Sequence, residues 1–191
     1  MSAELRLFIA IPIPVTPAIE AVREKLRECG PALRVSRDDT LHLTVKFLGA
    51  TPSDHVPEIE SVLQETLADQ KGFSLQLQGV GVFPKPSRPS VVWIGMEDNP
   101  TLQSIATRLE DNLASIGFPK EDLPFRPHIT IARVRRGLRL NLNDFCETYQ
   151  DVELGTQPAT PIVLYESNLN NQSGGPTYHE LIEIPLHSAK A

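Results

Sequence analysis

The chain has 191 residues, of which 40% are hydrophobic and 22% are charged, the composition of an ordinary folded protein with length for a substantial core. No apolar run approaches the roughly 20 residues of a membrane-spanning helix, and the start, MSAELRLFIAIPIP, lacks the basic region of a signal peptide. We therefore expect a cytoplasmic protein with no membrane partner. The net charge of −6 argues against wrapping a long nucleic acid, which needs many phosphate contacts, but it allows a pocket for one terminal phosphate.

Strand and helix patterns alternate in the first half of the chain. The segment LRLFIAI at residues 5–11 predicts a strand that Pro12 stops. From Thr16 the apolar residues fall at helical spacing as far as Cys29, which predicts a helix. A strand at 41–48 follows, then a turn at 49–52, and Ser53 is a candidate cap for a second helix.

The second half continues the same mixture. Hydrophobic alternation predicts strands over 73–82 and 91–96, joined by a proline-rich turn. Asn99 is placed to cap a third helix, with Pro100 at its first position and Gly117 closing it. The remaining predicted elements are a strand at 128–134, a weak helix near 143–150, and strands near 160–168 and 177–185. The hairpin-like connections favour antiparallel sheets, so we expect an α+β fold.

The strand LHLTVKFLG at residues 41–49 carries polar side chains on one face. Side chains at positions i and i+2 of a strand share a face, so His42 and Thr44 should point the same way and Lys46 should join them. The other face is apolar. Alone, this pattern is typical of a half-exposed strand in an antiparallel sheet.

A second strand repeats the pattern in the other half of the chain. The segment PHITIARV at residues 127–134 places His128 and Thr130 as His42 and Thr44 are placed, and each strand follows an amphipathic helix. We interpret this repeat as two similar lobes of sheet and helix. If the lobes pack about a pseudo-twofold axis, the two imidazoles face each other across a cleft.

Two facing histidines are suited to coupled proton transfer. Histidine titrates near neutrality, so one ring can take a proton from a nucleophile while the other gives one to a leaving oxygen. Displacement at phosphorus needs such groups on opposite sides of the phosphorus atom. The hydroxyls of Thr44 and Thr130 could then donate hydrogen bonds to the phosphate oxygens, and this chemistry requires no metal and no other cofactor.

The paired motifs HLTV and HITI resemble the signature of the 2H phosphoesterase superfamily. Together with RLFIAI, HLTVKFLG, FRPHITIAR and YESNLNNQSGGPTYHELIEIPL, they are similar in order to the RNA 2′,3′-cyclic phosphodiesterases, long called 2′-5′ RNA ligases. The resemblance implies one bilobal α+β domain over residues 1–191, two pseudo-symmetric antiparallel-sheet-plus-helix lobes around a central cleft. It also implies hydrolysis, without metal, of a terminal 2′,3′-cyclic phosphate on RNA or a nucleotide to a 2′-phosphate.

The resemblance also implies roles for single residues. His42 resembles the proton donor to the 3′ oxygen, His128 resembles the acceptor that activates water, and Thr44 and Thr130 resemble the phosphate-binding hydroxyls. Arg133 matches an arginine of the family. In a regular strand, however, it would lie on the face opposite His128, so it needs a bulge or the strand end to reach the site.

Three other readings stay open. The same residues could run the reverse reaction and join RNA ends in a 2′-5′ linkage, although abundant water favours hydrolysis. The chain could bind cyclic-phosphate ends without catalysis, but binding alone has no need of two titrating bases. A metal site on His42 and His128 lacks carboxylate or cysteine companions at ligand spacing. The expected partners are RNA ends or nucleotides with 2′,3′-cyclic phosphate, and we expect the chain to be a monomer.

Overall fold

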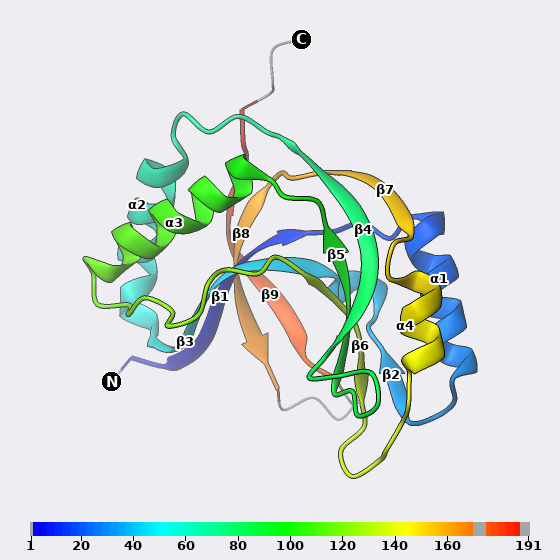
Figure 1. The fold of residues 1–191 in the computed structure, drawn as a ribbon. Coiled ribbons are helices and arrows are strands. Elements are labelled where there is room, and N and C mark those ends of the chain that lie inside the picture. The colour runs from blue at the N-terminus through cyan, green and yellow to red at the C-terminus, as the bar shows by residue number, and fades with distance from the viewer. Residues whose placement is uncertain (1, 170–174, 188–191) are drawn as a thin grey trace.

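A computed structural model describes residues 2–169 and 175–187 of the chain (Figure 1). The strands are β1 (Glu4–Pro12), β2 (Leu33–Val35), β3 (His42–Pro52), β4 (Ser74–Phe83), β5 (Val91–Met96), β6 (Ile129–Val134), β7 (Glu153–Pro158), β8 (Ile162–Asn168) and β9 (Thr177–Ile184). The α-helices are α1 (Pro17–Glu28), α2 (Val56–Leu67), α3 (Pro100–Ala114) and α4 (Asn143–Tyr149), and two 3-10 turns, η1 (Asp38–Thr40) and η2 (Ser53–His55), precede β3 and α2. Helices and antiparallel strands are mixed along the chain, which confirms the α+β prediction.

The strands follow one hydrogen-bonded path in the order β7-β4-β5-β6-β3-β1-β8-β9, with β2 attached to β6. Every pairing between these strands is antiparallel. At the middle of the path, β3 and β6 meet at a single pair of residues, Leu43 and Ile129, both fully buried. This narrow joint divides the strands into two halves, each containing one of the two repeated motifs.

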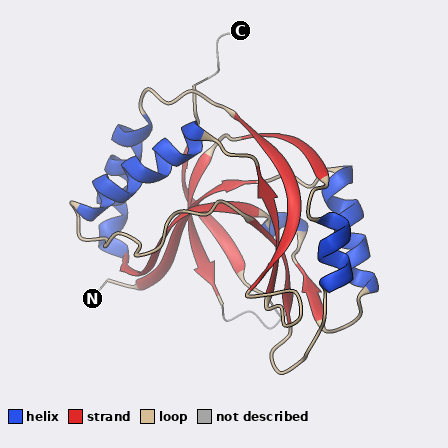
Figure 2. Cartoon of the chain, viewed as in Figure 1, coloured by secondary structure: helices blue, strands red, loops and turns tan. Residues whose placement is uncertain are grey.

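The helices lie on two sides of the strands (Figures 1 and 2). Helices α2 and α3 pack against each other and cover the half that contains β1 and β3, whereas α1 and α4 cover the half that contains β4 and β6. The helix that precedes each motif strand in the sequence therefore packs against the other half: α1 contacts β6, and α3 contacts β3.

Strand β1 is buried on both faces, which explains its continuous apolar sequence. Leu7, Ile9 and Ile11 belong to the main core beneath the helices. Phe8 and Ala10 point the other way and form a second buried cluster with Val163 and Tyr165 of β8, on which Tyr178 of β9 packs. This second cluster forms part of the floor beneath His42, whose ring centroid lies 5.0 Å from that of Phe8.

Side chains cap the starts of α1 and α3, and the cap at Asn99 was predicted. The Thr16 side chain accepts a hydrogen bond from the backbone N–H of Ile19 at the start of α1, at 3.3 Å. The Asn99 side chain accepts one from Leu102 at the start of α3, at 3.0 Å, and Pro100 occupies the first turn. Both side chains satisfy an N–H group that the helix itself leaves without a partner.

Three details differ from the sequence prediction. Ser53 does not cap α2, because residues 53–55 form the turn η2 and the helix begins only at Val56. The expected turn at 49–52 is strand, because β3 continues to Pro52 and pairs with β1 along that length. The strands β2 and β7 were not predicted; β2 has only three residues, too few for an alternating pattern to show.

Candidate active site

One cavity of about 610 Å³ takes its lining from both halves of the fold. The residues of the two motifs that line it are His42, Thr44, His128, Thr130 and Arg133. The structure thus brings together the five residues that were predicted to act on or bind the substrate. None is deeply buried, so each side chain can meet a ligand in the cavity.

The joint between β3 and β6 explains how the motifs meet. Leu43 pairs with Ile129, and these are the middle residues of His-Leu-Thr and His-Ile-Thr. In an antiparallel pair the flanking residues run in opposite directions, so His42 lies on the side of Thr130 and Thr44 on the side of His128. The pair itself is therefore the centre of the local twofold relation between the motifs.

Both imidazoles are held by the same backbone hydrogen bond. His42 Nδ1 lies 2.7 Å from the carbonyl oxygen of Thr40, and His128 Nδ1 lies 2.8 Å from that of Arg126. A carbonyl oxygen only accepts hydrogen bonds, so each Nδ1 must carry a hydrogen. The other nitrogen, Nε2, is then the one that accepts a proton when the ring is neutral and donates one when the ring is charged.

A β-bulge lies at the same place in each motif strand. The pairing of β1 with β3 skips Val45, and the pairing of β5 with β6 skips Ile131, so each bulge lies three residues after a histidine. A bulge adds one residue and reverses the alternation beyond it. The side chain five residues after each histidine therefore returns to the cavity face: Phe47 in one half and Arg133 in the other.

The bulge explains how Arg133 reaches the cavity although it is five residues from His128. It also shows that the prediction for Lys46 was wrong. Lys46 does not share the face of His42 and Thr44; it points into the protein, is 3% exposed, and pairs with Glu110 of α3 at 2.8 Å. Its ammonium also donates to the carbonyl oxygen of Pro119 at 2.7 Å, so it ties β3 to α3 rather than to a substrate.

The environment of His42 favours its neutral form. Burial lowers the pKa of His42 from its usual 6.5, and the positive charges of Arg133 and His128 act in the same direction. The hydrogen bond to the Thr40 carbonyl opposes this shift of the pKa. An anion bound between the rings would raise the pKa again, because it stabilises the imidazolium.

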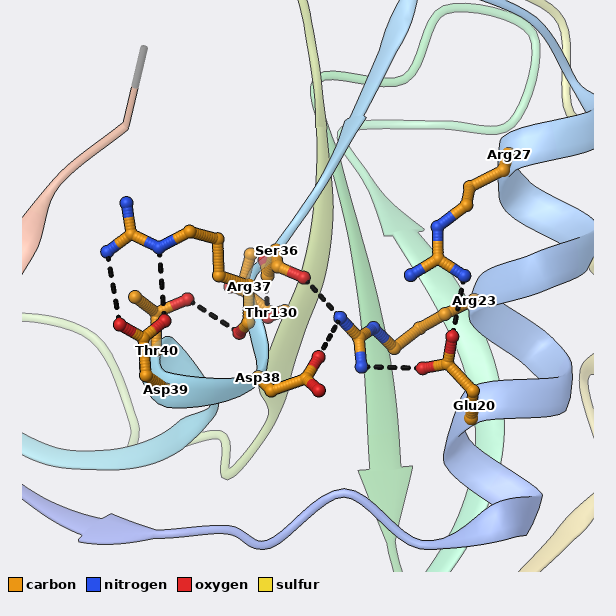
Figure 3. Close-up of polar contacts among 9 residues, drawn as sticks. All are labelled: Glu20, Arg23, Arg27, Ser36, Arg37, Asp38, Asp39, Thr40 and Thr130. Atoms are coloured by element: carbon orange, nitrogen blue, oxygen red, sulfur yellow. Dashed lines mark hydrogen bonds and ion pairs between the residues drawn. The ribbon is translucent and has the colours of Figure 1, made fainter. Parts of the chain in front are cut away.

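The segment Ser36–Thr40, called here the connecting segment, contacts Thr130 of one motif (Figure 3) and His42 of the other. The Ser36 hydroxyl donates to the carbonyl oxygen of Thr130 at 3.1 Å, and the Thr40 carbonyl holds His42. The guanidinium of Arg23, a buried residue of α1, fixes this segment. It donates to the Ser36 carbonyl at 2.6 Å and to Asp38 at 2.7 Å.

The cavity also contains residues for which the sequence suggested no role. Tyr178 stands edge-on to His42, with ring centroids 5.0 Å apart, and Phe47, Arg34 and Arg37 line the wall. Phe47 could be assigned to the cavity only by knowing the bulge. Arg34 lies on the short β2 and Tyr178 on β9, so their places in the cavity depend on tertiary structure.

In residues 2–169 and 175–187, no group of three or more His, Cys, Asp or Glu side chains is placed to hold a metal ion. None of the helices in that part of the chain is long and apolar enough to cross a membrane.

The fold and the paired motifs agree with the comparison with known families. The family model of the 2′-5′ RNA ligase superfamily matches residues 11–156. This chain belongs to that superfamily.

Individual relatives are similar over nearly the full length. The RNA 2′,3′-cyclic phosphodiesterase of Methanocaldococcus jannaschii is 34% identical over 182 residues, which cover 94% of this chain and 99% of the relative. The enzyme of the same name from Aeropyrum pernix is 32% identical over 170 residues, 88% of this chain and 94% of the relative.

Two solved structures share the fold. The protein TT0787 of Thermus thermophilus aligns with a TM-score of 0.75 and 26% identity, over 97% of this chain and 100% of that one. The LigT protein of E. coli in complex with 3′-AMP aligns with a TM-score of 0.69 and 27% identity, over 96% and 99% of the two chains.

Proposed function

We propose that this chain hydrolyses the 2′,3′-cyclic phosphate at the end of RNA or of a nucleotide and leaves a 2′-phosphate. One observation carries the proposal: two histidines line one cavity, and a carbonyl fixes each at Nδ1, which makes Nε2 the nitrogen for proton transfer. The activity agrees with the names of the relatives, which are RNA 2′,3′-cyclic phosphodiesterases. The two halves act as one domain, because the cavity takes residues from both.

In the proposed reaction, His128 Nε2 accepts a proton from water as the water oxygen bonds to phosphorus. The bond from phosphorus to the 3′ oxygen breaks, and His42 Nε2–H gives its proton to that oxygen. The anionic phosphate raises the pKa of His42 before this step, which offsets the effect of burial. Solvent returns the two rings to their starting protonation states after product release.

The remaining motif residues bind the phosphate. The hydroxyls of Thr44 and Thr130 donate to its non-bridging oxygens, and the guanidinium of Arg133 balances its negative charge. Because these donors lie on strands fixed by the joint between β3 and β6, they need no reorganisation during the reaction.

The test is to incubate the purified chain with adenosine 2′,3′-cyclic phosphate and identify the product isomer by phosphorus NMR. We expect the 2′-phosphate. His42→Ala and His128→Ala should each lower kcat by about 10²–10⁴-fold, the usual contribution of one acid or base. His179→Ala is the matched control, because His179 is exposed and does not line the cavity; its kcat should equal that of the unaltered chain.

A substrate with a more acidic leaving group distinguishes the two histidines. Such a group needs little protonation, so this substrate should restore the turnover of His42→Ala far more than that of His128→Ala. Restoration of His128→Ala alone would reverse the assigned roles. Binding of the cyclic phosphate with no turnover would overturn the catalytic proposal and leave a binding module.

The reverse reaction is measured in the same preparation. RNA with a 2′,3′-cyclic end and RNA with a 5′-hydroxyl end are supplied together, and a 2′-5′ linked product is compared with the hydrolysed end. Hydrolysis should dominate. We further propose that the chain acts as a monomer on RNA ends in the cytoplasm; light scattering of the purified protein checks the first point and fractionation of cells checks the last.

A further inference from the structure

Two arginines lie directly opposite each other on the cavity wall. Arg34 of β2 pairs in register with Arg133 of β6, and both side chains line the cavity. Like charges at directly opposite positions of an antiparallel pair destabilise a sheet. An arrangement that weakens the fold at the wall of a site is better explained by a ligand than by stability.

The two guanidiniums have no carboxylate partner in the described residues. The ion pairs there involve other cations, among them Arg23 and Arg27 on α1 and Arg37 beside Asp39. Residues 170–174, which the structure leaves undescribed, read NNQSG and contain no acidic side chain. The chain has 24 acidic residues, more than its 18 lysines and arginines, so carboxylates are not scarce. The positive charge of this pair is left for a ligand.

The pair lies close to the reacting centre. Both guanidiniums act on the phenol of Tyr178, where their charges oppose the rise of its pKa that burial causes. The Tyr178 ring is itself in contact with His42, at a centroid distance of 5.0 Å. Tyr178 thus interacts with both arginines and with His42 in the same cavity.

The other half of the site differs in kind. The position equivalent to Arg133 is Phe47, which pairs with Phe8 of β1. Arg133 itself pairs with Val91 of β5 on one side and with Arg34 of β2 on the other. Beside the bulge in β3 the cavity is lined by Phe47 and Phe8, whereas beside the bulge in β6 it is lined by Arg133 and Arg34. The reacting phosphate already receives Thr44, Thr130 and one arginine in the proposed mechanism, so a second cation exceeds what one phosphate needs.

We infer that Arg34, beside Arg133, binds a second phosphate of the substrate: the one on the 5′ oxygen of the nucleotide that carries the cyclic phosphate. This inference rests on the proposed function and specifies its substrate class. In an RNA end this second phosphate is the phosphodiester to the preceding nucleotide, and in a free nucleotide it is a 5′-phosphate. The site would favour either of these over a nucleoside 2′,3′-cyclic phosphate.

The turnover test compares three substrates that differ at the 5′ oxygen: adenosine 2′,3′-cyclic phosphate, its 5′-phosphorylated form, and a dinucleotide with the same cyclic end. The measured quantity is the ratio of kcat/KM for each phosphorylated substrate to that for the nucleoside. Arg34→Gln should lower this ratio by about tenfold or more, as expected for a lost charge-assisted hydrogen bond. Arg34→Lys should lower it less, because it keeps the charge and loses only the forked geometry.

Arg136→Gln is the matched control. It removes the same charge from the exposed basic segment after β6, outside the cavity, and should leave the ratio unchanged. A ratio that falls equally in Arg136→Gln would show a general electrostatic attraction and overturn the local site. The local site is also overturned if Arg34→Gln leaves the ratio unchanged. This includes the case in which Arg34→Gln lowers kcat/KM equally for all three substrates. The dinucleotide carries the second phosphate as a phosphodiester and the 5′-phosphorylated nucleotide carries it as a monoester. The larger of the two ratios identifies the form that the site prefers.

A binding measurement separates this inference from the proposed reaction. Adenosine 2′-phosphate and adenosine 2′,5′-bisphosphate are titrated calorimetrically into the unaltered chain and into Arg34→Gln. The bisphosphate should bind more tightly to the unaltered chain, and Arg34→Gln should abolish most of that preference. If the chain turns over no cyclic phosphate but shows this preference, the proposed function fails and the second phosphate site holds. If the preference is missing, the site fails whatever the turnover.

Discussion

The buried guanidinium of Arg23 allows a quantitative test of the connecting segment. Arg23→Met keeps most of the side-chain volume and removes every donor. The lost bond to the Ser36 carbonyl is charge-assisted and contributes about 1.5–3 kcal/mol. The pair with Asp38 adds about 0–1 kcal/mol, because 77% of that carboxylate side chain is exposed to solvent.

Two effects reduce the loss. Glu20 keeps its second partner, Arg27, at 2.6 Å, so it is not left unpaired. The Nε of Arg23 is buried without a partner, and the substitution removes that unsatisfied donor. The net loss in the free energy of unfolding should therefore be about 2 kcal/mol. For a chain of this length that corresponds to a melting temperature lower by about 4–8 °C.

Urea unfolding followed by circular dichroism measures the loss, with Arg27→Met as the matched control. Arg27 lies on the same helix and bonds to Glu20, but 47% of its side chain is exposed, so its removal should cost less than about 1 kcal/mol. Below the melting range, Arg23→Met should also lower kcat, because the connecting segment positions the Thr40 carbonyl that holds His42. Equal stability of the two variants would refute this account of the segment.

Three further outcomes follow from the site. If His42 is the proton donor, the alkaline limb of the kcat/KM profile against pH should lie below pH 6.5, because burial lowers the pKa of its imidazolium. Arg133→Gln removes a positive charge that also lowers this pKa, so it should move the alkaline limb to higher pH. If the acid limb moves instead, His42 is the base. Thr44→Val and Thr130→Val should each lower kcat/KM by about ten- to hundredfold, less than loss of a histidine, in steady-state assays. Turnover should survive EDTA. If EDTA removes the activity and a divalent ion restores it, a metal-dependent mechanism is favoured.

The sequence predicts most of the long elements, because their signals are local. Alternation indicates β4 and β5, and capping residues fix the starts of α1 and α3. The strand β2 could not be predicted, because three residues are too few to show a periodic pattern. Its place beside β6 is set by tertiary contacts.

The candidate site was predictable as far as the motif repeat reached. Two copies of His-x-Thr indicated which residues to bring together, but nothing in the letters VKF or IAR marks a bulge. For that reason strand alternation misplaces two side chains. Lys46 is an even number of residues from His42 and yet is buried, whereas Arg133 is an odd number of residues from His128 and yet faces the cavity. Arg34 was beyond sequence reasoning, because its importance comes from the residue opposite it on another strand.

The bracing of both imidazoles by main-chain carbonyls makes the site tolerant of mutation at the two bracing positions. Thr40 and Arg126 share no side-chain chemistry, yet each accepts the same hydrogen bond from the histidine two residues later. Where a carboxylate orients a histidine, one substitution can remove that support. Here every residue type offers the same oxygen, so only a change in the path of the backbone can remove it. Substitutions at Thr40 and Arg126 that preserve the backbone path should therefore leave both imidazoles oriented.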